Sequence, residues 1–169
     1  ERAYKDGIDI VLASGKRSTF YINGKKVSLH PEGLWLIAKL LLEKLKKHPE
    51  ITAVGGLTIG ADPLASAVAA LSFETGQNLK AFLVRKEAKG HGTGSKIEGD
   101  LDKGEKVAIL EDTVTTGGSA QKAIDAVVEV GAVPVVVMAI ADREDPDADA
   151  FRKKYTVDCL LTLSEIRGS

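Results

Sequence analysis

The chain has 169 residues, of which 44% are hydrophobic; this is enough for one domain with an apolar core, and no Pro/Gly/Ser-rich linker divides it. Its 23 basic and 24 acidic residues give a net charge of -1, which argues against a nucleic acid or a membrane surface as a partner. The single cysteine excludes an internal disulfide, and the sequence has neither a zinc-ligand spacing nor an apolar leader, so we expect a cytoplasmic protein.

The first thirty residues predict a small hood at the edge of a larger domain. Residues Glu1 to Asp6 are interpreted as the end of a helix that stops at Gly7. Two short β-like runs follow, Ile10 to Leu12 and Phe20 to Ile22, and they flank a turn, SGKRS, that contains two cations. Such cations serve either solubility or the binding of an anionic substrate.

A helix, a strand and a second helix come next. Pro31 suits the first turn of the first helix, and Trp35 is expected to pack at its edge rather than to bind a base. Ile51 to Leu57 has the length of a buried parallel strand, and a glycine-rich loop leads from it into the second helix, which begins at Pro63 and ends at Gly76. The spacing predicts an apolar face on the first helix that comprises Leu34, Leu36, Ile37, Leu40, Leu41 and Leu45.

Residues 85–104, RKEAKGHGTGSKIEGDLDKG, interrupt this pattern after a strand predicted at Lys80 to Val84. The segment is rich in glycine and charge and contains almost nothing apolar, so it cannot form a core. It matches neither the Walker A pattern nor the dinucleotide motif G-x-G-x-x-G, because Ser95 stands where the third glycine would be. Its cations suit either a solvated segment or a mobile lid that closes over a polyanion such as pyrophosphate.

The stretch VAILEDTVTTGGS has the order strand, acidic pair, hydroxyl-glycine loop, helix. Val107 to Leu110 has the length of a buried parallel strand, and the carboxylates Glu111 and Asp112 follow it directly. Apolar residues then recur at helical spacing from Ala120 to Val130, and Gly131 is placed to end that helix. The sequence therefore predicts a strand-to-helix loop at the carboxyl end of a buried strand.

This loop has the composition of a phosphate site. Glycines allow the backbone to approach a ligand, hydroxyls donate to phosphate oxygens, and a helix start favours an anion, which suits Thr113 to Ser119. Carboxylates would repel a phosphate, so Glu111 and Asp112 suit sugar hydroxyls or a magnesium ion nearby. A ribose phosphate satisfies both halves, whereas the alternative is an ordinary turn beside a solvated acidic pair. The Thr113 hydroxyl either joins the site or faces the sheet.

The remaining elements complete a doubly wound α/β domain. Val133 to Ala141 predicts a strand that ends at Asp142 and Arg143, and Asp158 to Leu163 predicts a last strand before a short polar tail at 164–169. Because strands alternate with helices, we expect a single domain over residues 1–169, with a mainly parallel, five-stranded sheet flanked by helices. Functional loops are expected at the carboxyl ends of the strands, capped by the hood, mainly residues 1–30.

Several of these motifs resemble one family. LEDTVTTGGS is similar to the phosphoribosyl-diphosphate (PRPP) signature of type I phosphoribosyltransferases, and FLVRKEAKGHGTGSKIEG resembles the flexible loop of orotate phosphoribosyltransferases. LASGKRSTFYINGKKV and ADRED extend the similarity over nearly the whole chain. The resemblance implies the type I phosphoribosyltransferase fold and transfer of the phosphoribosyl group from PRPP to orotate, which yields orotidine 5′-monophosphate and pyrophosphate.

The resemblance also implies residue roles. The acidic pair holds the ribose hydroxyls, the following loop binds the 5′-phosphate, and cations of the flexible loop, about residues 85–104, contact the pyrophosphate. The residues assigned to PRPP are Arg85, Lys86, Lys89, His91, Glu111, Asp112, Thr113, Val114, Thr115, Thr116, Gly117, Gly118 and Ser119. Those assigned to orotate are Lys16, Arg17, Phe20, Tyr21, Thr115 and Arg143. Lys89, His91 and Asp112 are assigned to catalysis.

The resemblance further implies Mg²⁺, held mainly by the diphosphate of PRPP and by water rather than by ligands from the chain. It implies a homodimer in which the flexible loop reaches the partner's site, so that Lys89 acts across the interface. The lysine that many relatives have after the first parallel strand aligns with Gly60, which leaves residues 56–61 to bind pyrophosphate through backbone N–H groups. The cation on the orotate side is either Lys16 or Arg17.

Two other functions are compatible with parts of the pattern. One is a phosphoribosyltransferase for a purine base, against which Arg143 and the VRKEAKGHGTG loop argue. The other is a PRPP-sensing regulator that binds RNA or DNA, which would need a basic face that the net charge of -1 does not suggest.

Overall fold

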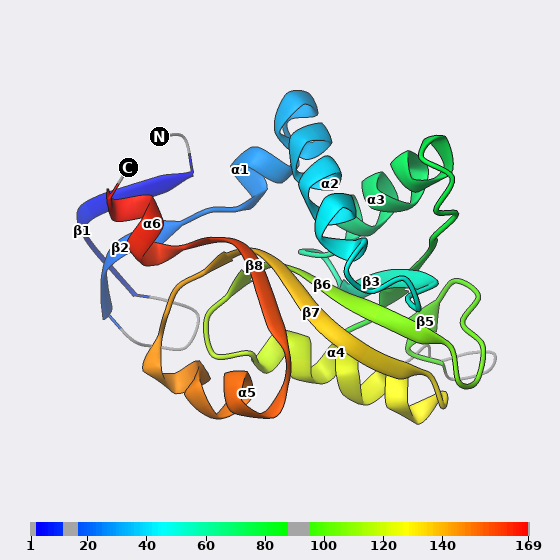
Figure 1. Cartoon of the computed structure of the whole chain (residues 1–169). Coiled ribbons are helices and arrows are strands. Elements are labelled where there is room, and N and C mark those ends of the chain that lie inside the picture. The colour runs from blue at the N-terminus through cyan, green and yellow to red at the C-terminus, as the bar shows by residue number, and fades with distance from the viewer. Residues whose placement is uncertain (1–2, 12–16, 88–94, 169) are drawn as a thin grey trace.

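The computed structural model describes residues 3–11, 17–87 and 95–168, and a six-stranded sheet lies at the centre of this part of the chain (Figure 1). The strand order is β5-β4-β3-β6-β7-β8, and every neighbouring pair is parallel except β4 with β5. The strands are β3 (Ala53–Leu57), β4 (Lys80–Val84), β5 (Ile97–Glu98), β6 (Lys106–Val114), β7 (Val133–Asp142) and β8 (Val157–Thr162). The predicted five parallel strands are confirmed, and the short β5 adds a sixth, antiparallel strand within the segment predicted to lack regular structure.

Helices cover both faces of this sheet (Figure 1). On one face lie α2 (Pro31–Leu45) and α3 (Asp62–Glu74), and on the other lie α4 (Gly118–Glu129) and α5 (Asp149–Lys154), the latter preceded by a 3₁₀ turn, η1 (Pro146–Ala148). The chain leaves β3 toward one face and the adjacent β6 toward the other. The doubly wound topology is therefore confirmed, and a ligand crevice is expected between the carboxyl ends of β3 and β6.

The core is divided between these two faces by the alternation of β6. Ala108 and Leu110 pack on the α2/α3 side, whereas Val107 and Ile109 pack on the α4 side, and all four are fully buried. β3 needs glycine at its centre, because a methyl group at Gly55 would lie 2.0 Å from the carbonyl oxygen of the paired strand β4. Because the central strands carry small or apolar residues on both faces, they are buried between the two layers of helices.

The hood is an antiparallel hairpin of β1 (Tyr4–Val11) and β2 (Arg17–Ile22), followed by α1 (Lys25–Ser28). The predicted helix end over Glu1 to Asp6 is therefore wrong for the described residues from 3 onward. Gly7 does have a left-handed φ of +66°, but it lies where the register between the strands shifts, a glycine bulge rather than a helix end. Pairing with β2 decides the strand conformation of this polar stretch.

Two further predictions of element boundaries are wrong. The polar tail after β8 is a short helix, α6 (Leu163–Gly168), which begins with a capping box: Glu165 N donates to Thr162 Oγ1 at 3.2 Å, and Thr162 N donates to Glu165 Oε2 at 2.7 Å. The strand predicted to stop at Leu110 continues to Val114, because β6 stays paired with β7 as far as Asp142. The acidic pair thus lies within a strand rather than after it.

The apolar face predicted for α2 is only partly buried. Ile37, Leu41 and Leu45 are buried, whereas Leu36 and Leu40 are 46% and 53% exposed. Trp35 is also exposed, with Lys39 Nζ 4.3 Å from the centre of its ring. The helix therefore carries a second apolar stripe on its outer side. No helix in the described part of the chain is long and apolar enough to cross a membrane.

Candidate active site

The functional side chains gather where β6 projects beyond β3. β3 pairs with β6 only as far as Ile109, whereas β7 accompanies β6 to Val114. The acidic pair therefore faces the loop that follows β3, and the hydroxyl-glycine loop comes next along the chain. This is the crevice expected at the switch point of the sheet.

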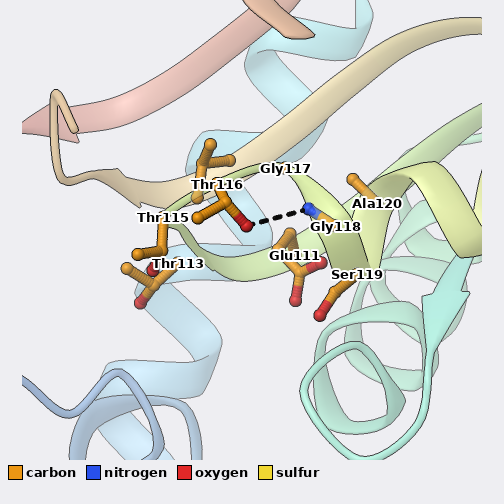
Figure 2. Close-up of a pocket in the computed structure, with 9 residues that line it drawn as sticks. Glu111, Thr113, Thr115, Thr116, Gly117, Gly118, Ser119 and Ala120 are labelled. Atoms are coloured by element: carbon orange, nitrogen blue, oxygen red, sulfur yellow. Dashed lines mark hydrogen bonds between the residues drawn. The ribbon is translucent and has the colours of Figure 1, made fainter. Parts of the chain in front are cut away.

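A small cavity of about 70 Å³ lies in the loop between β6 and α4 (Figure 2). Gly117, with φ +80°, forms the turn into α4, and a methyl group there would lie 2.4 Å from the Phe151 ring. Gly118 N donates to Thr116 Oγ1 at 3.4 Å, as Figure 2 shows. The cavity is lined by Glu111, Thr113, Val114, Thr115, Thr116, Gly117, Gly118, Ser119 and Ala120. Thr113 is among these lining residues, and the role of its hydroxyl in binding stays a prediction.

This cavity suits a phosphate group. It lies at the N-terminal end of α4, whose first N–H groups have no carbonyl acceptor within the helix, and the first turn of α4, all of it described, contains no acidic residue. Its volume of about 70 Å³ corresponds to two or three water molecules, at roughly 30 Å³ for each. Main-chain donors, hydroxyls and the helix dipole thus converge on one anion-sized space.

Glu111 is a buried carboxyl group at the edge of this cavity. The residue is 6% exposed, and its Oε2 has no hydrogen-bond partner among the described residues. Burial, with a contribution from the charge of Asp112, raises the pKa of Glu111 to about 8. At neutral pH the group is therefore mainly protonated and can donate a hydrogen bond, for example to a sugar hydroxyl.

Asp112 is held from two sides. Lys25 Nζ, at the start of α1, donates to Asp112 Oδ2 at 2.7 Å. On the other side lies the loop after β3: a methyl group at Gly60 would be 3.1 Å from Asp112 Oδ1 and 3.3 Å from Glu111 Oε1. The loop position at Gly60 is therefore backbone packed directly against the acidic pair.

A second cavity, of about 370 Å³, lies between β2 of the hood and the end of β7. Arg143 is 7% exposed at its wall; its Nη2 donates to Ser18 Oγ at 3.3 Å, and its guanidinium lies 4.5 Å from the centre of the Phe20 ring. Its Nε has no partner within the described segments, and burial lowers the pKa of Arg143. A buried cation stacked on an aromatic ring is suited to a planar anionic ligand.

Neighbouring helices fix the turn that presents Arg143. Arg152 of α5 donates to both carboxylate oxygens of Asp142, at 2.9 and 3.1 Å, and to the carbonyl oxygen of Asp145 at 2.6 Å. Glu144 accepts hydrogen bonds from Ser164 N at 2.8 Å and Ser164 Oγ at 2.5 Å. The turn is thus tied to both α5 and α6.

The other residues assigned to orotate are placed differently. Arg17 lines the second cavity, but its guanidinium is exposed and donates to Asp9 across the hairpin. Tyr21 does not line this cavity, and Thr115 lines the first cavity instead. Lys16 lies outside the described residues, so the choice between Lys16 and Arg17 stays open.

The cations of the segment from 85 to 104 lie only in part within the described residues. Arg85 and Lys86 line a third cavity of about 560 Å³ together with Thr58 of the loop after β3. Arg85 Nε donates to Glu98 Oε1 of β5 at 2.6 Å. Lys89 and His91 lie outside the described residues. The two described cations thus face the same loop that packs against the acidic pair.

Sequence reasoning missed Lys25 and Ser18, which contact Asp112 and Arg143. Ser18 precedes Phe20 by two residues on a strand, so alternation places the two side chains on one face, and this signal could have found it. No feature of the sequence distinguishes Lys25 from the neighbouring Lys26, so its contact with Asp112 could not be predicted.

No protein-family model matches the chain. Orotate phosphoribosyltransferases of Nostoc sp. and Thermosynechococcus vestitus are 47% and 51% identical to it, over 89% and 88% of this chain and 72% and 78% of theirs. The solved structure of Mycobacterium tuberculosis H37Rv orotate phosphoribosyltransferase matches with a TM-score of 0.81 at 35% identity, covering 97% of this chain and 91% of that one. Each match extends over most of both chains.

Proposed function

The chain belongs to the orotate phosphoribosyltransferase family, and from this premise we propose how its residues divide the reaction. The enzyme transfers the 5-phosphoribosyl group of PRPP to orotate and yields orotidine 5′-monophosphate and pyrophosphate, a step of pyrimidine biosynthesis. The observation that supports our assignment most strongly is the position of Arg143. It is a buried cation over an aromatic ring, and it lies at the same end of the sheet, beyond the carboxyl ends of the strands, as an anion-sized cavity.

The PRPP half of the reaction is assigned to β6, its loop and the start of α4. The main-chain N–H groups at the start of α4, with the hydroxyls from Thr113 to Ser119, bind the 5′-phosphate. Glu111 and Asp112 bind the ribose hydroxyls, for which a protonated and an ionised carboxyl group offer a donor and acceptors side by side. The loop from 56 to 61 binds pyrophosphate through its backbone, together with Arg85, Lys86, Lys89 and His91.

The orotate half is assigned to the second cavity. Arg143 pairs with the carboxylate of orotate, and Phe20, which lies under Arg143 at the wall of the cavity, is placed near the pyrimidine ring. A ring nitrogen of orotate then attacks the anomeric carbon of PRPP as the bond to pyrophosphate breaks. Positive charge grows on the ribose and negative charge on the leaving group, so the cations that surround the pyrophosphate carry most of the catalysis.

Phosphoribosyltransferases that use PRPP typically require a divalent metal ion, which we propose is Mg²⁺ in this enzyme. The described residues contain no group of three or more His, Cys, Asp or Glu side chains that could hold a metal ion, and the acidic pair is assigned to the ribose. The lack of such a group among the described residues fits a metal ion that is held by the diphosphate of PRPP and by water. When bound, the metal neutralises charge on the leaving diphosphate.

We also propose a homodimer in which the flexible loop completes the partner's site. The stripe of Trp35, Leu36 and Leu40 on α2, with Phe73 at 77% exposure on α3, offers apolar surface for such an interface. A loop shared in this way places Lys89 beside the partner's pyrophosphate. Mixing a variant defective in the loop with a variant defective in the orotate site tests this arrangement.

An assay of pyrophosphate release from PRPP tests the function directly. We expect release that depends on orotate, that is not supported by hypoxanthine or xanthine, and that falls when Mg²⁺ is removed by a chelator and returns when it is added back. Release with a purine base and not with orotate would contradict the acceptor assignment. Equal release with and without metal would contradict the role of Mg²⁺.

Replacing both carboxylates, Glu111→Gln with Asp112→Asn, is expected to weaken PRPP binding about tenfold or more, the effect of losing a hydrogen bond to a charged group. Calorimetric titration of PRPP measures this change, and the near-isosteric amides should leave the fold intact. Unchanged PRPP affinity would contradict the ribose role.

Glu111→Gln alone supplies a second test through stability. Between pH 4.5 and about 8 the folded protein holds a proton on Glu111 that the unfolded chain has released, so this group lowers the free energy of unfolding as the pH rises. We therefore expect the variant to gain thermal stability relative to the wild type at pH 8 compared with pH 5.

A further inference from the structure

Lys25 makes a contact that neither the fold nor the assigned reaction explains. It begins α1 in the hood, and its Nζ lies 2.7 Å from Asp112 Oδ2 on β6, which is 87 residues further along the chain. This bond raises the pKa of Lys25, with smaller contributions from the charges of Asp112, Tyr21 and Glu111. The lysine is therefore a fixed positive charge beside the acidic pair.

The backbone that carries Lys25 is held in place by two close approaches. A methyl group at Gly24 would lie 3.2 Å from Asp112 Cβ, so the chain before α1 packs directly on β6. A methyl group at Gly33 would lie 2.5 Å from the carbonyl oxygen of Val27, so α1 also packs tightly against the start of α2. Because α1 packs against both β6 and α2, the backbone of Lys25 is held close to Asp112.

The two oxygens of Asp112 have different surroundings. Oδ2 accepts the hydrogen bond from Lys25, whereas Oδ1 faces the backbone at Gly60 in the loop after β3. We propose that Lys25 is a positioning residue for PRPP: it holds one oxygen of Asp112 and so orients the other toward the ribose hydroxyls. The inference rests on the proposed ribose role of the acidic pair and extends it to a residue of the hood.

The charges around Glu111 support this role. Asp112 on β6 raises the pKa of Glu111 and Lys25 on α1 lowers it, whereas Gly60 of the loop after β3 and Ser119 of α4 bring no charge. The charge of Lys25 thus acts on both members of the acidic pair, through a hydrogen bond to Asp112 and through a lowering of the pKa of Glu111. Without it, the pKa of Glu111 is expected to rise further above its value of about 8.

If Lys25 served only to stabilise the fold, its loss would lower the melting temperature and leave PRPP binding unchanged. The side chain of Lys25 is 46% exposed, and an ion pair this accessible to water contributes little to stability. Removing the charge should therefore leave the melting temperature nearly unchanged and act on PRPP instead. Weaker PRPP binding without a change in melting temperature would therefore distinguish a positioning role from a structural one.

The test compares Lys25→Met with Lys25→Arg and with Lys26→Met, which removes the same charge from the exposed neighbouring lysine. For Lys25→Met we expect a KM for PRPP raised about tenfold, as for the loss of one charge-assisted hydrogen bond, with the KM for orotate nearly unchanged. The pH midpoint of PRPP binding should move to higher pH. Lys25→Arg should restore most of the affinity, and Lys26→Met should behave as the wild type.

Binding of ribose 5-phosphate, measured by calorimetry, separates this inference from the acceptor assignment, because the probe contains the ribose and the phosphate but neither orotate nor pyrophosphate. We expect Lys25→Met to weaken ribose 5-phosphate binding as well. If Lys25→Met and Lys26→Met bind PRPP and ribose 5-phosphate equally well, with the same pH midpoint, the positioning role is wrong. A wild type that binds ribose 5-phosphate but does not use orotate would contradict the proposed acceptor instead.

Discussion

Arg143→Met is expected to lower kcat/KM for orotate by about a thousandfold, while PRPP affinity stays within about twofold of the wild type. Arg143 is 7% exposed and its guanidinium lies over the Phe20 ring, so the orotate carboxylate would lose a buried, charge-assisted partner. Truncating one member of such a pair costs about 2 to 5 kcal/mol, because the other charge is left without compensation. Steady-state kinetics with orotate varied at saturating PRPP measure the effect.

Arg167→Met is the matched control for this variant. The guanidinium of Arg167 also lies over the Phe20 ring, at 4.8 Å from its centre, but its side chain is 43% exposed, and it donates to Tyr4 Oη at 3.0 Å. Its loss should change kcat/KM for orotate only a few fold. Equal losses in the two variants would mean that the ring, and not the charge of Arg143, recognises the acceptor.

Lys89→Ala is expected to lower kcat by about a hundredfold or more, the effect of removing one preorganised contact to developing charge. Lys89 lies outside the described residues, and its assignment rests on the resemblance of the VRKEAKGHGTG loop together with Arg85 and Lys86 at the adjoining cavity. The control is Lys96→Ala, an exposed lysine further along the same segment. Single-turnover kinetics should show slower chemistry in Lys89→Ala, and near-wild-type rates would contradict its catalytic role.

Mixing the Lys89→Ala and Arg143→Met variants tests the shared loop. If each site combines the core of one subunit with the loop of the other, a mixed dimer contains one site with both defects and one site with neither. A mixture at equal concentrations should then recover about a quarter of the wild-type activity, since half of the dimers are mixed. No recovery after subunit exchange would show that each loop serves its own subunit.

Much of the fold follows from local signals. Buried parallel strands are continuous apolar runs, so β4 is predicted with its observed bounds, and Gly131 with its left-handed φ ends α4 as expected. β1 could not be predicted in this way, because YKDGIDIV is a strand only through its pairing with β2. The capping box of α6, Thr162 with Glu165, was a readable signal in a stretch that otherwise looks like a polar tail.

The site is predictable where its residues are neighbours in the sequence. The cavity between β6 and α4 is built from one continuous segment, so composition and spacing suffice to find it. Arg143 and Phe20 meet across 123 positions, and only the resemblance to a family associates them. The high pKa of Glu111 results from burial, which the motif does not encode, and Lys25 is distinguished from Lys26 only by the path of α1.

The glycine turn at Gly117 has a consequence for how this enzyme tolerates mutation. The proposed phosphate site uses main-chain N–H groups, which remain when side chains are shortened, so alanine scanning from Thr113 to Ser119 will report the hydroxyls and overlook the amides. Gly117 is different, because any side chain there meets the Phe151 ring and strains a backbone with φ +80°. Gly117 should therefore tolerate substitution least of the positions in this loop.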